Sequence, residues 1–390
     1  MRSRDRVLVA LNHEEPDRVP IDLGSTGVTS ITKRAYVGLR RELGLPEEDV
    51  EVIDLVQQLP RVGEDVLEAL GVDTRGLRVN PPGGRGPEIL DEGDYLAFYD
   101  EFGAKLRMPK QDGYYFDWTD SSLAAPRPEA LAALPWPDPD DPSRYAGLRE
   151  RARAVYEETD YALVGVMPLG GDLMLRLRQV RGFAEGLMDL LVNEDFAEVF
   201  LDKVTDLALR SWSHFLAEVG DYIQVAVMAE DLGTQTGPLI SPSLYRRLIK
   251  PRQARIVQLI KQKSRAKVFL HSCGAVYDFL PDLVEVGFDI LNPVQLAAAG
   301  MGDTARLKRE FGRHLIFWGG ACDVQRVLPF GSAEHVREET CRRVRDLAPG
   351  GGFVLAASHN IQSDVPPRNV VAMFAAARDC GRYPLKGPSR

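Results

Sequence analysis

The sequence has few features of membrane, secreted or nucleic-acid-binding proteins. None of its apolar runs approaches bilayer-spanning length, and the N-terminus has no cleavage-site pattern of a signal peptide. Acidic residues outnumber basic ones by 57 to 48, and the formal net charge of -9 argues against nucleic acid and anionic membranes as partners. The 390 residues include only four cysteines, without the spacing of a disulfide framework, so we expect reduced thiols in a cytoplasmic protein.

Nucleotide-binding signatures are also missing. No G-x-G-x-x-G opens a helix after a strand, and there is no Walker A motif. The chain instead alternates between strand-like runs and long amphipathic segments, which implies right-handed parallel crossovers. Eight such runs favour an α/β fold with a closed (β/α)8 TIM barrel over an open sheet. The runs are residues 18–24, 77–79, 162–166, 222–227, 268–270, 289–292, 315–318 and 352–356.

The barrel pattern carries two additions. An N-terminal helical extension begins with a helix over residues 3–11, which Ser3 can cap, and later helices are predicted over 30–43 and 61–70. Residues 80–125 open with a Pro/Gly-rich loop and continue as a small antiparallel meander, either a structural flap or a cap over a substrate pocket. We predict one domain over residues 1–390, with a Pro-rich loop at 124–144 and a tail at 382–390.

One predicted strand ends in an unusual triplet, His271-Ser272-Cys273, followed by Gly274. Side chains two apart on an extended backbone point to the same side, so an imidazole and a thiol share one face. In barrel enzymes the carboxyl ends of the strands carry the active site. Nitrogen and sulfur ligands suit zinc, and a catalytic zinc has three protein ligands and an open position. We therefore predict a metal site at His271 and Cys273.

Further polar residues follow other predicted strands. They are Glu230, Asp231, Asn292, Cys322 and His359. Because strand ends meet at one mouth of a barrel, we expect these side chains to surround the same site. The other two cysteines, at positions 341 and 380, fall in helical segments and are predicted to be structural.

The chain resembles the uroporphyrinogen decarboxylase superfamily, which includes cobalamin-dependent methyltransferases on the same barrel. The resemblance covers nearly the whole chain, with family-like segments at residues 6–20, 317–320 and 348–353. His271-Ser272-Cys273-Gly274 matches the H-x-C zinc motif of the methyltransferase branch, and His359 falls where that branch has its third ligand, usually a cysteine. True decarboxylases carry arginines after the first strand, whereas residues 21–27 contain none.

The resemblance implies a zinc-dependent methyltransferase. Zinc held by His271, Cys273 and either His359 or Cys322 would lower the pKa of a thiol that accepts a methyl group from methylcobalamin on a partner corrinoid protein. In the reverse direction it would polarise the oxygen of a methyl donor attacked by cob(I)alamin. The family position favours His359 as the third ligand.

The remaining roles and the reaction stay open at this stage. Glu230 or Asp231 is either a fourth ligand or a proton-handling group, and Asn292 is a further candidate catalytic residue. Two other functions remain: uroporphyrinogen decarboxylase itself, and a non-catalytic barrel that binds a corrinoid or small ligand. A homodimer is compatible with the sequence. The sequence does not choose the methyl donor, the acceptor or the direction of transfer.

Overall fold

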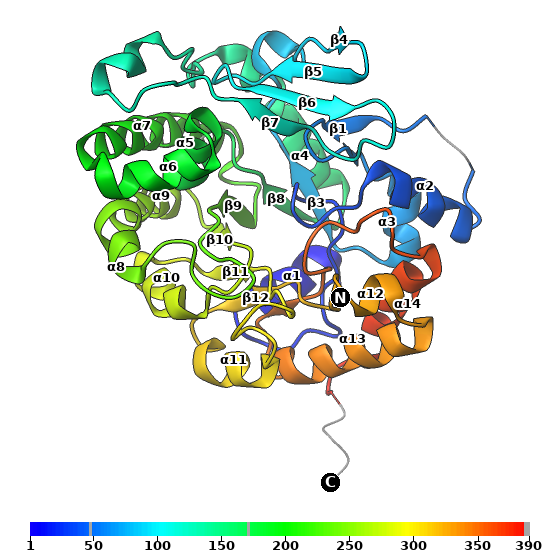
Figure 1. Cartoon of the computed structure of the whole chain (residues 1–390). Coiled ribbons are helices and arrows are strands. Elements are labelled where there is room, and N and C mark those ends of the chain that lie inside the picture. The colour runs from blue at the N-terminus through cyan, green and yellow to red at the C-terminus, as the bar shows by residue number, and fades with distance from the viewer. Residues whose placement is uncertain (47–48, 170–171, 386–390) are drawn as a thin grey trace.

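The computed structural model describes residues 1–46, 49–169 and 172–385. Its centre is a curled sheet of seven parallel strands in the order β13-β12-β11-β10-β9-β8-β3, surrounded by helices (Figure 1). The strands are β3 (Thr74–Leu77), β8 (Ala162–Gly165), β9 (Val225–Ala229), β10 (Lys267–His271), β11 (Ile290–Asn292), β12 (Ile316–Trp318) and β13 (Phe353–Val354). This confirms the TIM-barrel-like α/β fold.

The helices match the predicted rhythm, with shifts at their ends. They are α1 (Ser3–Leu11), α2 (Lys33–Glu42), α3 (Glu64–Leu70), α4 (Leu148–Glu158), α5 (Leu173–Arg181), α6 (Phe183–Val192), α7 (Glu194–Val219), α8 (Pro242–Leu244), α9 (Lys250–Lys263), α10 (Leu280–Val286), α11 (Thr304–Phe311), α12 (Val327–Phe330), α13 (Ala333–Leu347) and α14 (Pro367–Cys380). Within the described parts of the chain, no helix is both long and apolar enough to cross a membrane.

The eighth position of the barrel is filled by a short segment rather than the full strand predicted at 18–24. Ile21 forms an isolated parallel bridge with Leu355. The Leu355 amide donates to the carbonyl of Pro20, and the Asp73 amide donates to the carbonyl of Ile21. This segment therefore lies between the two edges of the sheet and closes it.

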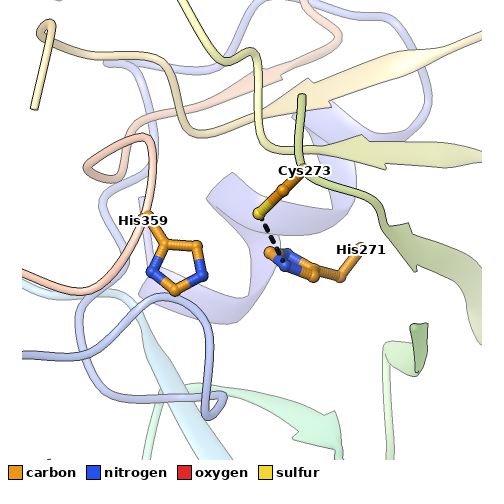
Figure 2. Close-up of side chains that lie close together, drawn as sticks. All are labelled: His271, Cys273 and His359. Atoms are coloured by element: carbon orange, nitrogen blue, oxygen red, sulfur yellow. Dashed lines mark hydrogen bonds between the residues drawn. The ribbon is translucent and has the colours of Figure 1, made fainter. Parts of the chain in front are cut away.

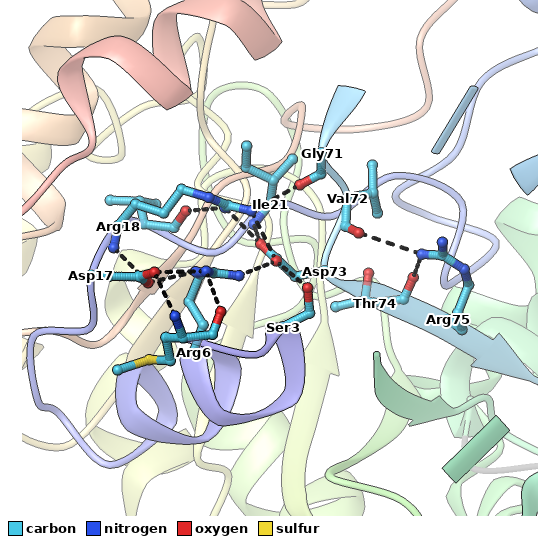
Figure 3. Close-up of polar contacts among 12 residues, drawn as sticks. Ser3, Arg6, Asp17, Arg18, Ile21, Gly71, Val72, Asp73, Thr74 and Arg75 are labelled. Carbon is cyan, nitrogen blue, oxygen red and sulfur yellow. Dashed lines mark hydrogen bonds and ion pairs between the residues drawn. The ribbon is translucent and has the colours of Figure 1, made fainter. Parts of the chain in front are cut away.

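A buried carboxylate fixes that closing segment. Asp73 accepts hydrogen bonds from the backbone N–H of Ile21 at 2.8 Å, from Ser3 Oγ at 2.8 Å, and from the guanidinium groups of Arg6 and Arg18 at 2.7 and 2.8 Å (Figure 3). Arg6 also pairs with Asp17, and this holds the pKa of the Asp17 carboxyl down at about 2. Ser3 thus binds Asp73 instead of capping α1, whose N-cap residue is Arg2.

The second barrel strand begins earlier than predicted, at Thr74 rather than Leu77. The sequence did not indicate this earlier start, because neither Arg75 nor Gly76 is typical of a buried strand. Arg75 points outward, where it pairs with Glu64 and stacks on Tyr161. Gly76 is required by packing, since a Cβ there would come within 2.2 Å of the Ser25 carbonyl oxygen.

Apolar side chains fill the barrel interior and α1 plugs it. Val7 and Leu11 of α1 join an inner cluster that includes Val164, Phe269 and Trp318. Helices packed outside the sheet form the larger core with its other face. The polar strand ends are therefore left at the opposite mouth of the barrel, where the predicted site lies.

The predicted meander is a four-stranded antiparallel sheet, drawn in cyan at the top of Figure 1. Its strands are β4 (Leu90–Glu92), β5 (Tyr95–Tyr99), β6 (Lys105–Pro109) and β7 (Asp117–Asp120). A separate two-stranded ladder joins β1 (Val52–Asp54) to β2 (Leu59–Pro60). The Pro-rich loop contains two short 3-10 turns, Pro128–Ala133 and Pro142–Arg144, and residues 386–390 of the predicted tail lie outside the described residues.

The cysteine prediction needs one correction. Cys341 of α13 and Cys380 at the end of α14 form a disulfide, with their Cα atoms 5.5 Å apart, so these two are not reduced thiols. The pair could not be recognised in the sequence, because its members are 39 positions apart and only the packing of α13 on α14 brings them together. Cys273 and Cys322 are free.

Candidate metal centre

Three side chains from two strand ends converge at the barrel mouth. The imidazoles of His271 and His359 and the thiol of Cys273 have ligand atoms that all lie within 4.8 Å of one another (Figure 2). Cys273 Sγ is 3.2 Å from His271 Nε2. Among the described residues, no other group of three histidine, cysteine or acidic side chains comes together in this way.

The loop after β10 is shaped by two glycines that touch. Gly274 has a positive φ of 88°, and a Cβ there would lie 2.5 Å from the backbone of Gly233. The loop after β9 is thereby packed directly against the loop that carries Cys273. Ser272 Oγ accepts a hydrogen bond from the Leu232 amide at 3.0 Å, which ties the two loops together. The His-x-Cys pair thus stands on a rigid double loop.

Asn292 orients the imidazole of His271. Asn292 Oδ1 lies 2.6 Å from His271 Nδ1, and Asn292 Nδ2 donates to the Trp318 carbonyl at 2.9 Å. The second bond fixes which end of the amide faces the ring. Because the Asn292 oxygen accepts, His271 Nδ1 carries the proton, and the lone pair of Nε2 is directed toward Cys273. Sequence reasoning had placed Asn292 at the mouth, and its contact with His271 is what the structure adds.

His359 is held by the residues on either side of it. Ser358 Oγ donates to the carbonyls of Val294 and Cys322, while Asn360 Oδ1 accepts from the Ser30 amide at 2.7 Å. The antiparallel sheet also reaches this loop, since Tyr115 Oη donates to Gln362 Oε1. The loop is therefore pinned at several points, and His359 faces the other two side chains (Figure 2).

Burial sets the protonation of all three groups. It lowers the pKa of His271, and it lowers the pKa of His359 to about 4, with the neighbouring His271 adding to the effect. Both imidazoles are therefore neutral at physiological pH, the form that binds metals. Burial raises the pKa of the Cys273 thiol, so in the absence of a cation the sulfur keeps its proton. A divalent metal would displace that proton.

Glu230 and Asp231 have different surroundings although they are adjacent in sequence. Glu230 is fully buried, and its carboxyl oxygens accept the amide N–H groups of Met174 and Leu175 at 2.9 and 3.0 Å, in the first turn of α5. Burial raises its pKa to about 8. Asp231 pairs with Arg178 at 3.4 Å, and its charge partly offsets the lowering of the pKa of His271 and His359 by burial. Glu230 thus fixes the start of α5, and Asp231 is the carboxylate whose charge acts on the candidate ligands.

Cys322 does not join the group. Its side chain is completely buried in the main hydrophobic core, and burial raises the pKa of its thiol. Between the two candidates for a third ligand, the geometry therefore favours His359 over Cys322. Sequence reasoning missed Arg178, because an arginine in a helical segment gives no sign of facing a strand end elsewhere in the chain.

The donor set fits zinc. Two neutral imidazoles and one thiol that can lose its proton make three protein ligands of the kinds that zinc prefers, and a catalytic zinc takes its fourth ligand from water or substrate. The hydrogen bond from His271 Nδ1 to Asn292 is the outer support that metal-binding histidines usually have.

Comparison with known proteins places this centre in a family. The family model for uroporphyrinogen decarboxylase (URO-D) matches residues 93–380. The chain belongs to the uroporphyrinogen decarboxylase family. The match includes β8 to β13 and the whole ligand group, and it confirms the family resemblance that the sequence motifs indicated.

The solved structure of a methyltransferase from Methanosarcina mazei has the same fold as this member of the uroporphyrinogen decarboxylase family. That structure matches with a TM-score of 0.62 and 19% identity, over 97% of this chain and 99% of the other. A native xylanase 10B from Thermotoga maritima matches more weakly, with a TM-score of 0.39 and 11% identity, over 62% of this chain and 82% of the other. No curated protein matches the chain.

Proposed function

We propose that this protein is a zinc-dependent methyltransferase that moves a methyl group between a small substrate or thiol and a corrinoid protein. The observation that carries the proposal is the convergence of His271, Cys273 and His359 within 4.8 Å at the barrel mouth. The shared fold with the Methanosarcina methyltransferase supports it, over nearly the full length of both chains. Zinc as the bound metal and a corrinoid protein as the partner are both part of what we propose.

Zinc at these three side chains would supply a Lewis acid, which makes a thiol acceptor nucleophilic near neutral pH or activates the oxygen of a methyl donor. The protein's own residues prepare the site. Asn292 holds His271 with its Nε2 lone pair facing inward, and the two pinned loops fix the distance between Cys273 and His359. In this proposal Asp231 is the group that accepts a proton from an incoming thiol.

Decarboxylation of a porphyrinogen, the reaction after which the family is named, is the alternative to methyl transfer. An acidic tetrapyrrole carries several carboxylates, which need several cations to hold them. Here the segment 21–27 contains no arginine, and its one acidic residue, Asp22, is buried and holds the Trp318 indole N–H at 2.9 Å and Thr74 Oγ1 at 2.6 Å. The segment 21–27 itself therefore offers no cation to a carboxylate.

Two measurements on the purified full chain test the proposal. Elemental analysis without added metal should find close to one zinc per chain, and Cys273→Ser should lose most of it. Incubation with uroporphyrinogen should give no measurable coproporphyrinogen. Full zinc retention in both Cys273→Ser and His271→Ala would remove the zinc assignment, and efficient porphyrinogen conversion would restore the decarboxylase. A protein without zinc would favour a non-catalytic ligand-binding barrel.

A further inference from the structure

A cavity of about 340 Å³ lies between the antiparallel sheet and the helices beside the barrel mouth. Trp118 and Asp120 of β7 form one wall, Leu175 and Arg178 of α5 the opposite wall, and Phe183 at the start of α6 the rim. The volume falls in the range of small-molecule sites. The antiparallel sheet therefore contributes a wall to a cavity, which supports the cap interpretation over a flap of purely structural use.

Asp231 connects this cavity to the candidate metal centre. Its side chain lines the cavity, and its charge acts on the pKa of His271, Cys273 and His359 alike. Glu230, the preceding residue, accepts the first amides of α5 and so fixes the helix that presents Arg178. The loop after β9, which carries Asp231, also packs on the loop that carries Cys273 through the bond from the Leu232 amide to Ser272 Oγ, so the cavity and the candidate metal centre share this loop.

Arg178 is the unusual group in this cavity. Its side chain is only 6% exposed, yet its ion pair with Asp231 is a single contact of 3.4 Å. Its Nε is buried without a hydrogen-bond partner among the described residues. A guanidinium has five N–H donors in a planar fork that matches an oxyanion. Much of the donor capacity of Arg178 is therefore unused in the protein itself.

Two exposed aromatic side chains form the largest apolar part of the cavity lining, beside polar residues such as Thr119 and Gln179. Trp118 is 40% and Phe183 61% exposed, high values for aromatic side chains. The Phe183 ring centroid lies 5.1 Å from Arg178 Cζ, so the aromatic ring and the cation are neighbours. Such a surface next to a buried cation suits a ligand with an apolar or aromatic body and one charged end.

The charges around the cavity favour a negative end once a metal is bound. Arg178 and Asp231 form an ion pair, so their charges cancel, and the Glu230 carboxyl is held by the amides of Met174 and Leu175. A divalent cation with one thiolate ligand would add one net positive charge beside Asp231. Asp120 is exposed, where water and salt screen its charge.

We propose that this cavity binds a small monoanionic substrate, with an apolar or aromatic body against Trp118 and Phe183 and its carboxylate, sulfonate or phosphate on Arg178. Binding of the anion in the cavity does not depend on the proposed methyl transfer; only the reaction of the bound molecule at the metal does. In this proposal Arg178 determines substrate specificity. A single cation is sufficient to bind a monoanion, whereas a tetrapyrrole polycarboxylate needs several.

Calorimetry on the zinc-loaded full chain with benzoate and its neutral analogue benzamide tests the charge preference. Benzoate should bind at least about tenfold more tightly than benzamide, and Arg178→Gln should abolish that preference. Arg176→Gln is the matched control, because Arg176 lies on the same helix but pairs with Asp172 and Asp100 instead. Arg176→Gln should keep the benzoate preference of the unaltered protein.

Trp118→Ala is a second variant that does not depend on the buried arginine. This substitution should weaken the binding of benzoate and of benzamide by the same factor, because it removes only an apolar part of the cavity wall. Equal binding of both probes, or an unchanged preference in Arg178→Gln, would overturn the cavity assignment while leaving zinc binding intact. An Arg178-dependent benzoate preference in a protein that takes up no zinc would instead support the cavity and overturn the proposed methyltransferase.

Discussion

Two buried polar clusters, one at each end of the barrel, are built on opposite principles. At the closed end, the Asp73 carboxylate accepts five hydrogen bonds, among them two from Arg18 and one from Arg6 (Figure 3). At the open end, the ligand atoms of His271, Cys273 and His359 face one another (Figure 2). In the first cluster opposite charges meet, whereas in the second three groups that prefer a cation lie side by side.

The difference lies in whether the polar groups of each cluster have opposite charges as partners within the protein. A buried carboxylate among guanidinium and amide donors is complete within the protein, and its removal costs stability. The second cluster has one internal contact, between Cys273 Sγ and His271 Nε2 at 3.2 Å, and a bound cation would give its three groups a shared partner. The predictions below test whether substitutions at the two ends separate stability from metal binding in this way.

The largest expected effect is loss of zinc on substitution of the third ligand. His359→Ala should lower zinc affinity by more than the roughly 10–100-fold that residues supporting a ligand typically contribute. Cys322→Ala is the matched comparison, because its side chain lies in the core and outside the ligand group. Competition titrations with a chromogenic chelator measure both. A larger loss in Cys322→Ala would move the third ligand there and leave His359 as a substrate-contact or acid–base residue.

The next largest effect belongs to the closed end. Asp73→Asn leaves Arg6 and Arg18 without their shared carboxylate, and should lower the free energy of unfolding by about 3–5 kcal/mol. Zinc binding by the folded variant should remain as in the unaltered protein. Urea denaturation followed by circular dichroism gives the stability, and elemental analysis gives the zinc. Asp5→Asn, which breaks an exposed pair with Arg2, should leave stability nearly unchanged.

The sequence revealed the open end more fully than the closed end, for a physical reason. His271 and Cys273 are two apart on one strand, so strand geometry alone placed them together, and the strand-end rule added Asn292, Asp231 and His359. The barrel and the antiparallel insertion followed from strand–helix alternation and turn composition. Local patterns of this kind are what a sequence displays.

Contacts between distant segments were not predictable in the same way. The strand Thr74–Leu77 was misplaced because Gly76 is chosen by the approach of Ser25, which no local pattern shows. The Cys341–Cys380 disulfide depends on how two helices pack, and the Asp73 cluster joins α1 to the closing segment. Arg178 at the cavity was missed for the same reason.

Substitution of Asn292 is expected to have a smaller effect on zinc affinity than substitution of His359. Asn292→Ala removes the oxygen that holds the proton on His271 Nδ1, and should weaken zinc binding by about 10–100-fold without abolishing it. Asn369→Ala is the control, since Asn369 is equally buried but bonds the carbonyls of Leu328 and Gly331. The same chelator competition applies. Equal zinc affinity in both variants would show that the orientation of His271 does not depend on Asn292.

Taken per pH unit, the smallest effect is a pH dependence of stability at Glu230. Burial raises the pKa of this carboxyl from 4.5 to about 8 in the folded protein, so between these values the folded state keeps a proton that the unfolded chain has lost. Stability should therefore fall as pH rises through this range, by up to about 1.4 kcal/mol per pH unit. Glu230→Gln cannot ionise, and its amide oxygen can still accept from the start of α5. Urea denaturation of chelator-treated protein from pH 5 to pH 8 should give a shallower decline in Glu230→Gln, and parallel curves for the two proteins would contradict a protonated Glu230.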